Sequence, residues 1–180
     1  MANTGERALI SAAQDGSEAA VEELFRRHWP QTHRAAFLIV RDAAAAEDIA
    51  QEAFLSALSA LGRFDRRRRF APWLHRIAVN RAIDWSRARS VRGEVAATEG
   101  LQDVVSPRPD PSAAIADRDE ISSALAGLPA DQRAVVVLRH LLGYTPGEIS
   151  RILDLPRGTI NSRLRRALDR LSETLGEGAP

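Results

Sequence analysis

The chain has 180 residues, of which 44% are apolar, enough for one domain or two small ones with a buried core. All 25 basic residues are arginine, 24 residues are acidic and cysteine is absent, which excludes a disulfide framework, a thiolate metal site and a cysteine nucleophile. No apolar run reaches the roughly 18–20 residues of a membrane-spanning helix, and the N-terminus lacks the pattern of a secretory signal. We therefore expect a soluble, cytoplasmic protein.

The net charge of +1 hides a strong asymmetry along the chain. Residues 63–92 hold 10 arginines and 2 acidic residues, whereas residues 1–62 hold 5 and 9, and residues 93–138 hold 3 and 8. A basic block inside a nearly neutral chain favours a polyanionic partner for that block. A solvated arginine face is the alternative interpretation.

Almost every segment favours helix, because alanine, leucine, arginine and glutamate dominate and no run of alternating β-branched residues occurs. Ser17 is placed to cap a helix that runs to about residue 29. The inward side chains of this helix are expected to be Val21, Leu24 and Phe25. Pro30 is expected to break or restart the chain, with a further helix over residues 31–40.

The clearest helical period lies at residues 46–61, where apolar side chains form one broad stripe. The opposite side carries Asp48, Gln51, Glu52 and Leu55, which lie at helical positions i, i+3, i+4 and i+7. An exposed leucine beside carboxylates suggests a partner with a basic, partly apolar surface. From the spacing alone, a plain polar face is the simpler interpretation.

A catalytic pair of carboxylates on this helix is rejected. The four histidines are scattered along the chain, at His28, His33, His75 and His140, and no metal-ligand spacing such as H-E-x-x-H occurs. The sequence therefore predicts neither an enzyme nor a bound metal.

Four consecutive arginines follow at residues 66–69, between the aromatic residues Phe64 and Phe70. Such a block can neutralise phosphates and hold unstacked bases, although burial of the aromatic rings in the core is a strong alternative. Pro72 is well placed as the first residue of a helix that runs to about residue 89. The face of this helix away from the core is expected to carry Arg76, Asn80, Ile83 and Arg87.

Residues 93–114 change character, with two glycines, three prolines and several acidic residues. They are the best candidate for a linker. We therefore predict an all-α protein of two small helical domains, at residues 1–92 and 115–175, joined by a flexible acidic linker at 93–114 and followed by a tail at 176–180.

The second domain carries a helix-turn-helix pattern. Thr145, Pro146 and Glu148 form a capping box that begins a short helix, and residues 154–156 make a tight turn before a second helix near residue 157. The inward residues of that helix are expected to be Ile160, Leu164, Ala167, Leu168 and Leu171. Its other sides are then rich in arginine and hydroxyl groups, as reading of a major groove requires. An ordinary helical hairpin with a solvated basic face is the alternative.

Both halves together resemble a known family. The stretches Glu47-Asp48-Ile49-Ala50-Gln51-Glu52-Ala53-Phe54, Arg69-Phe70-Ala71-Pro72-Trp73-Leu74 and Ile77-Ala78-Val79-Asn80 resemble region 2 of bacterial extracytoplasmic-function (ECF) sigma factors. Leu128-Pro129 and the run from Leu155 to Leu164 resemble their region 4. The resemblance covers about residues 18–175. It implies an RNA polymerase sigma factor, which binds core RNA polymerase and directs promoter-specific initiation, with no cofactor and no small-molecule substrate.

The resemblance also implies roles for single residues. Core polymerase would be bound through the coiled coil of its β′ clamp and through its β flap, the former by Asp48, Gln51, Glu52 and Leu55. The −10 element would be bound and opened by Phe64, Arg66, Arg67, Arg68, Arg69, Arg76, Asn80, Ile83 and Arg87. The −35 element would be read by Arg157, Thr159, Asn161, Ser162, Arg163, Arg165 and Arg166. The acidic linker would run through the RNA path of the polymerase, and an anti-sigma factor is a candidate regulatory partner.

One departure from the family concerns Asn161, which stands where lysine or arginine is common. The second hypothesis is a stand-alone helix-turn-helix transcriptional regulator with a helical sensing or dimerisation domain. Under that hypothesis the arginine block and the Asp48 face have no task, and β′ should not co-purify with the chain.

Overall fold

The computed structural model describes residues 2–92 and 123–176, and all regular secondary structure within them is helical. The first part comprises α1 (Ala2–Gln14), α2 (Glu18–Val40), α3 (Ala43–Ala60), the 3-10 turn η1 (Leu61–Arg63) and α4 (Phe70–Val91). The second comprises α6 (Ala130–Val136), its π-helical continuation η2 (Val137–Leu141), α7 (Pro146–Leu153) and α8 (Arg157–Gly176). The predicted all-α class with two helical domains is confirmed. The predicted linker, at residues 93–114, lies outside the described residues.

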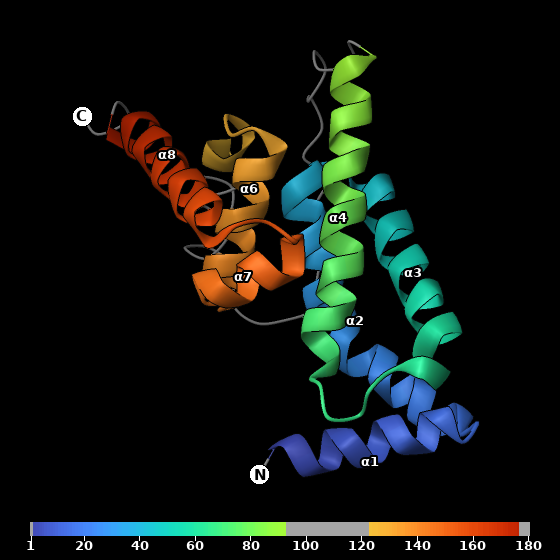
Figure 1. Ribbon diagram of the computed structural model, residues 1–180. Coiled ribbons are helices and arrows are strands. Elements are labelled where there is room, and N and C mark those ends of the chain that lie inside the picture. Colours follow the sequence, from blue (N-terminus) through green and yellow to red (C-terminus); the bar gives the residue numbers. More distant parts are fainter. Residues whose placement is uncertain (1, 93–122, 177–180) are drawn as a thin grey trace, which may run out of the picture.

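Helices α2, α3 and α4 pack side by side, and α1 lies across one end of them (Figure 1). The stripe predicted on α3 is the side that faces this bundle, because Ile49, Ala53, Phe54 and Ala57 are all buried. Asp42 caps α3 by accepting a hydrogen bond from the Ala45 backbone N–H at 3.0 Å. Within the described ranges, no helix combines the length and the hydropathy needed to cross a bilayer.

The break expected at Pro30 is wrong, because α2 runs through it without interruption. Side chains on both sides of the proline are buried in the bundle, among them Leu24 before it and Ala36 and Ile39 after it. This packing outweighs the cost of about 3 kcal/mol that a proline imposes inside a helix. Ser17 caps the helix as predicted, accepting from the Ala20 backbone N–H at 3.3 Å.

Two features of the first domain were not predicted. Helix α1 precedes the helix that Ser17 caps, and it buries Ile10 and Ala13 against the end of the bundle. Phe25 was expected inward but is 40% exposed, since it packs along the surface, against Trp29 and Phe54 with ring centroids 4.7 and 4.8 Å away.

The two domains are docked on each other through a shared hydrophobic core. Ile39 and Val79 of the first domain belong to the same buried cluster as Val135, Leu138 and Ile149 of the second. Helix α4 contacts both α6 and α7, so it is covered by the bundle on one side and by the second domain on another. The sequence gives no sign of this docking, and it decides which side chains of α4 remain accessible.

Candidate partner- and nucleic-acid-binding surfaces

The acidic face of α3 is present as predicted. Asp48, Gln51 and Glu52 are exposed, and Leu55 between them and the end of the helix is 64% exposed. Glu52 lies 3.5 Å from the Arg81 guanidinium of α4, so one of its oxygens is partly engaged. The result is a surface with an accessible apolar side chain beside negative charges, which complements a basic, partly apolar partner.

The arginine loop, which we define as residues 64–69, connects η1 to α4. Arg66, Arg67 and Arg68 are exposed, as phosphate contacts require. Asp65 shapes the turn, because its side chain accepts from the Arg67 backbone N–H and its carbonyl accepts from the Arg68 N–H, both at 2.9 Å.

Phe64 does not face outward from this loop, so the expectation that it is available to a DNA base is wrong. Its ring is buried against Trp73 and Phe70, with centroid distances of 4.6 and 5.9 Å. The ring fills the end of the bundle where α1 closes it, and the burial of its apolar area outweighs any gain from exposing it for a ligand. Trp73 is only half-buried.

The accessible face of α4 includes fewer residues than the sequence predicts. Arg76 and Arg87 are exposed and Asn80 is half-buried, so these three remain on an accessible side. Ile83 is only 6% exposed and belongs to the core shared by the two domains, so its placement on the outer face is wrong. The physical reason is the docked second domain, which buries a second side of α4.

The helix-turn-helix is built as its sequence predicts. The capping box of α7 is complete: Thr145 Oγ1 accepts from the Glu148 N–H at 3.3 Å, and Glu148 Oε2 accepts from the Thr145 N–H at 2.9 Å. The backbone N–H and the hydroxyl of Thr145 both donate to Glu148 Oε2, and these two hydrogen bonds hold the pKa of Glu148 below its ordinary value. Asp154 ends α7 in the left-handed conformation, and the Leu155 N–H returns to the Ser150 carbonyl at 3.1 Å. The chain thereby turns directly into α8.

Helix α8 presents most of the predicted reading face. Arg157, Asn161, Arg165 and Arg166 are exposed. Thr159 and Ser162 are half-buried, and the Ser162 hydroxyl donates to the Thr159 carbonyl at 3.0 Å.

Two side chains of α8 differ from the prediction. Arg163 has a side chain only 18% exposed and is 3.2 Å from Asp131 at the start of α6, so it ties α8 to α6. Leu168, expected inward, is 46% exposed, because Ala167 is the residue that packs into the cluster with Leu125 and Leu128.

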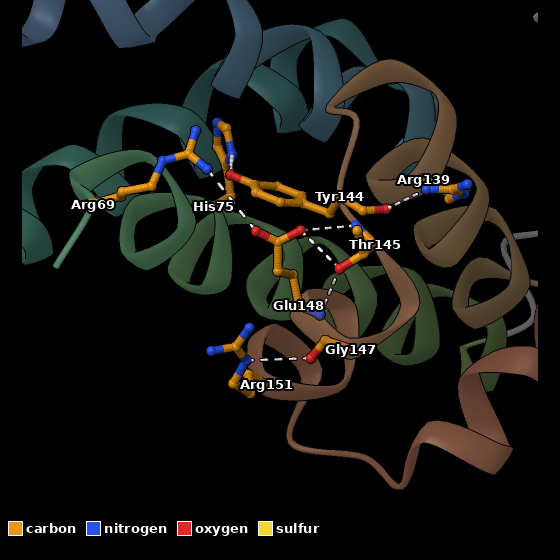
Figure 2. Close-up of polar contacts among 8 residues, drawn as sticks. All are labelled: Arg69, His75, Arg139, Tyr144, Thr145, Gly147, Glu148 and Arg151. Atoms are coloured by element: carbon orange, nitrogen blue, oxygen red, sulfur yellow. Dashed lines mark hydrogen bonds and ion pairs between the residues drawn. The ribbon is translucent and has the colours of Figure 1, made fainter. Parts of the chain in front are cut away.

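The seam between the domains holds a buried polar contact, shown in Figure 2. The Tyr144 hydroxyl lies 2.7 Å from Nδ1 of His75, and both residues are buried. Burial, together with the nearby charges of His28 and Arg69, lowers the pKa of His75 to about 4, and burial raises the pKa of Tyr144. A neutral imidazole accepts the tyrosine proton at Nδ1, so this contact depends on an uncharged His75.

The arginine loop also takes part in the seam. Arg69 Nη1 lies 3.9 Å from Glu148 Oε1, so the last arginine of the loop faces the glutamate of the α7 capping box (Figure 2). Elsewhere on the seam, Arg133 of α6 donates to the Ile39 carbonyl at the end of α2 at 2.7 Å. Burial lowers the pKa of Arg133 to about 10. The sequence does not predict this role, since the partner of Arg133 is a backbone atom far away in the chain.

No metal centre emerges among the residues that the structure describes, where no three histidine or carboxylate side chains gather closely enough to hold an ion.

Comparison with known proteins agrees with this arrangement. Residues 24–92 match the family model for Sigma-70 region 2, and residues 118–171 match that for Sigma-70, region 4. The chain is 38% identical to the ECF RNA polymerase sigma factor SigM of Mycobacterium tuberculosis, over 93% of this chain and 83% of that protein. It is 35% identical to the RNA polymerase sigma factor CarQ of Myxococcus xanthus, over 91% and 94% of the two chains.

Solved structures give the same result. CnrH, in complex with the cytosolic domain of CnrY, superposes with a TM-score of 0.72 at 26% identity, over 97% of this chain and 99% of that one. The sigma factor RpoE of Bartonella quintana, in complex with the anti-sigma factor NepR, gives 0.67 at 25% identity, over 88% and 98%. The chain belongs to the ECF group of RNA polymerase sigma factors.

Proposed function

We propose that this sigma factor binds core RNA polymerase through the acidic face of α3, engages the −10 element with the arginine loop and α4, and reads the −35 element with α8. It acts in the cytoplasm as a specificity subunit and catalyses no reaction of its own. One observation carries the proposal: a single chain presents an acidic, partly apolar face and two separate arginine-rich surfaces, the latter at the loop and on α8. Membership of the sigma factor family does not favour the stand-alone regulator.

The polymerase contact rests on the exposed Leu55 and the carboxylates beside it. The coiled coil of the β′ clamp is the proposed partner, and reversing the charges of this face should prevent the contact. We expect Asp48→Arg with Glu52→Arg to abolish co-purification of β′. The loss of the Glu52–Arg81 pair should cost the fold little, since surface ion pairs contribute about 0–1 kcal/mol.

A matched control reverses as much charge elsewhere in the same domain. Asp15 and Glu22 are both exposed, in the turn after α1 and on α2. Asp15→Arg with Glu22→Arg should leave β′ binding intact. If the wild-type chain, the α3 variant and this control variant all bind β′ equally, the assignment of the α3 face is contradicted.

At the −10 element we assign phosphate contacts to Arg66, Arg67 and Arg68, which are exposed. Each phosphate contact contributes about 0.7–0.9 to the slope of log affinity against log salt. The triple alanine variant should therefore lower the slope of the holoenzyme–promoter affinity by about 2–3. An unchanged slope would remove the loop from the DNA interface.

At the −35 element we assign base or phosphate contacts to Arg157, Asn161, Arg165 and Arg166, with Thr159 and Ser162 nearby. Arg163 is a supporting residue through its ion pair with Asp131. Asn161→Ala distinguishes the two kinds of contact. A lost base contact changes preference at one position, by about 1–3 kcal/mol, whereas a lost phosphate contact weakens all sequences alike.

The docked arrangement is proposed to be a resting form. Two elements 25 base pairs apart are separated by about 85 Å of duplex, at about 3.4 Å per base pair. A compact chain of this length has a radius of gyration of only about 16 Å. Promoter binding thus needs separation of the domains at the seam, which releases Arg69 from Glu148. An anti-sigma factor, as reported for the sigma factor of Bartonella quintana, is the partner proposed to hold the chain out of the polymerase.

A further inference from the structure

Gln14, the last residue of α1, connects this helix to the base of the arginine loop. Its Nε2 donates to the Leu61 carbonyl at 2.8 Å and to the Phe64 carbonyl at 2.9 Å. These two carbonyls belong to the first residue of η1 and to the residue that follows it. One side-chain amide therefore joins the two ends of the turn from which the loop emerges.

The Leu61 carbonyl also accepts the 3-10 hydrogen bond from the Phe64 N–H at 2.9 Å, whereas the Phe64 carbonyl lies beyond the last hydrogen bond of η1. Phe64 is extended, with φ −70° and ψ 129°, so its carbonyl points away from the helical ladder and takes its donor from Gln14. Backbone carbonyls in half-buried places require such a partner. Because both acceptors are backbone atoms, no side-chain pattern within the loop discloses this contact.

A second contact joins the same side of α1 to the loop itself. Arg66 Nη1 donates to Ser11 Oγ at 2.7 Å, and Ser11 lies one helical turn before Gln14. Helix α1 is itself fixed, since Ile10 and Ala13 are buried in one cluster with the ring of Phe64. The anchored helix thus presents two polar side chains to the loop.

Four adjacent arginines repel one another, and a loose loop must be ordered when DNA binds. Holding the loop in advance removes that ordering cost from the opening step. We propose that Gln14 is a positioning residue for promoter opening, which holds the arginine loop in place for the −10 strand. The inference rests on the proposed function of the loop. It concerns a helix outside the matched Sigma-70 region 2, which begins at residue 24.

The test uses the full chain with core polymerase and a duplex promoter fragment, selected from genomic DNA by transcription with this holoenzyme. Gln14→Met keeps the length of the side chain and removes the donor. Gln31→Met makes the same substitution at an exposed position of α2 and is the matched control. The rate constant of strand opening is followed by permanganate reactivity of unpaired thymines.

We expect Gln14→Met to slow opening by about fivefold to thirtyfold, since two hydrogen bonds are lost. Affinity for core polymerase and for the closed promoter should stay the same, and a promoter with a pre-opened bubble should restore the rate. A purely structural defect would instead lower the fraction of active holoenzyme on the duplex and on the bubble template alike. That result would overturn the proposal. An opening rate equal to that of Gln31→Met would also overturn it.

Two further variants make the outcome decisive. If Gln14→Met fails to fold, Gln14→Asn replaces it, because its amide is one methylene too short to bridge the Leu61 and Phe64 carbonyls. A wild-type opening rate in that variant would overturn the proposal in the same way. The triple alanine variant of residues 66–68 runs in parallel. If it opens the promoter normally, the proposed function of the loop is wrong; if it is slow while Gln14→Met is normal, only the role of Gln14 is wrong.

Discussion

Replacing Tyr144 with phenylalanine removes one hydroxyl from the seam between the domains and leaves the aromatic ring in place. That hydroxyl lies 2.7 Å from Nδ1 of His75, and the two rings meet edge to face with centroids 5.8 Å apart. The substitution therefore isolates the hydrogen bond from the packing. It leaves a buried imidazole nitrogen without its partner.

A buried polar group left unsatisfied costs about 1–3 kcal/mol. Because the hydroxyl and the imidazole come from different domains, this cost falls on the docked arrangement. Once the domains separate, water can bond to His75 and the cost disappears. The ratio of docked to separated molecules should thus fall by about fivefold to 150-fold.

Arg69→Gln provides the comparison, because it removes a second polar contact of the seam, the ion pair with Glu148. The Arg69–Glu148 pair is 3.9 Å long and the arginine side chain is 64% exposed. Such a pair contributes about 0–1 kcal/mol, so the population should change by no more than about fivefold. The structure therefore predicts an order of effects as well as a direction.

The assay is single-molecule energy transfer between one dye on each domain. The chain has no cysteine, so single cysteines at the exposed positions Ala60 and Ser172 label α3 and α8 without background. We expect the high-transfer population to shrink most in Tyr144→Phe. An unchanged distribution in Tyr144→Phe, or a larger loss in Arg69→Gln, would show that the Tyr144–His75 hydrogen bond does not hold the domains together.

Three further predictions concern stability. Burial lowers the pKa of the His75 imidazole from 6.5 to about 4. As the pH falls, His75 therefore binds a proton in the unfolded chain at a higher pH than in the folded chain. The free energy of unfolding should decrease between pH 6.5 and pH 4, by about 2 kcal/mol at pH 5. Urea unfolding at pH 7 and 5 measures this, and His75→Gln should reduce the difference; equal pH dependence in both proteins would contradict it. Pro30→Ala should raise the free energy of unfolding by about 1–3 kcal/mol, since a proline inside α2 lacks the N–H of the helical hydrogen bond. Pro146→Ala lies at the first turn of α7, where proline is tolerated, and should bring no gain. A similar change in both variants would show that the helix interior is not the cause. Thr145→Ala should cost about 1 kcal/mol through the lost cap and weaken −35 binding, and a wild-type unfolding midpoint would argue against the capping role.

Features that depend on neighbours in the chain could be predicted from the sequence. The capping box of Thr145 and Glu148 follows from two residues three positions apart, and the structure contains it in full. The buried stripe of α3 follows from helical spacing, and with it the opposite face that carries Asp48 and Leu55. Each of these features concerns a single helix, with the core on one side and solvent on the other.

Features that depend on contacts between distant segments could not be predicted. Ile83 is placed on the outer side of α4 by helical spacing, but it is buried in a cluster to which both domains contribute. Phe64 is buried for a similar reason, since α1 closes the end of the bundle over the cluster that holds its ring. Gln14 and Arg133 act on backbone carbonyls more than 40 residues away, and no residue pattern encodes such acceptors.

Transcription reconstituted from purified core polymerase, this chain and a pool of genomic promoter fragments tests whether the chain is a promoter-specificity subunit. Transcripts from a distinct set of promoters should appear only when the chain and core polymerase are both present. We also expect their loss with Asp48→Arg and Glu52→Arg and their retention with Asp15→Arg and Glu22→Arg. The absence of any promoter-specific transcript from the pool would contradict the proposed function. Tight, sequence-specific DNA binding by the isolated chain, unchanged by core polymerase, would also contradict it.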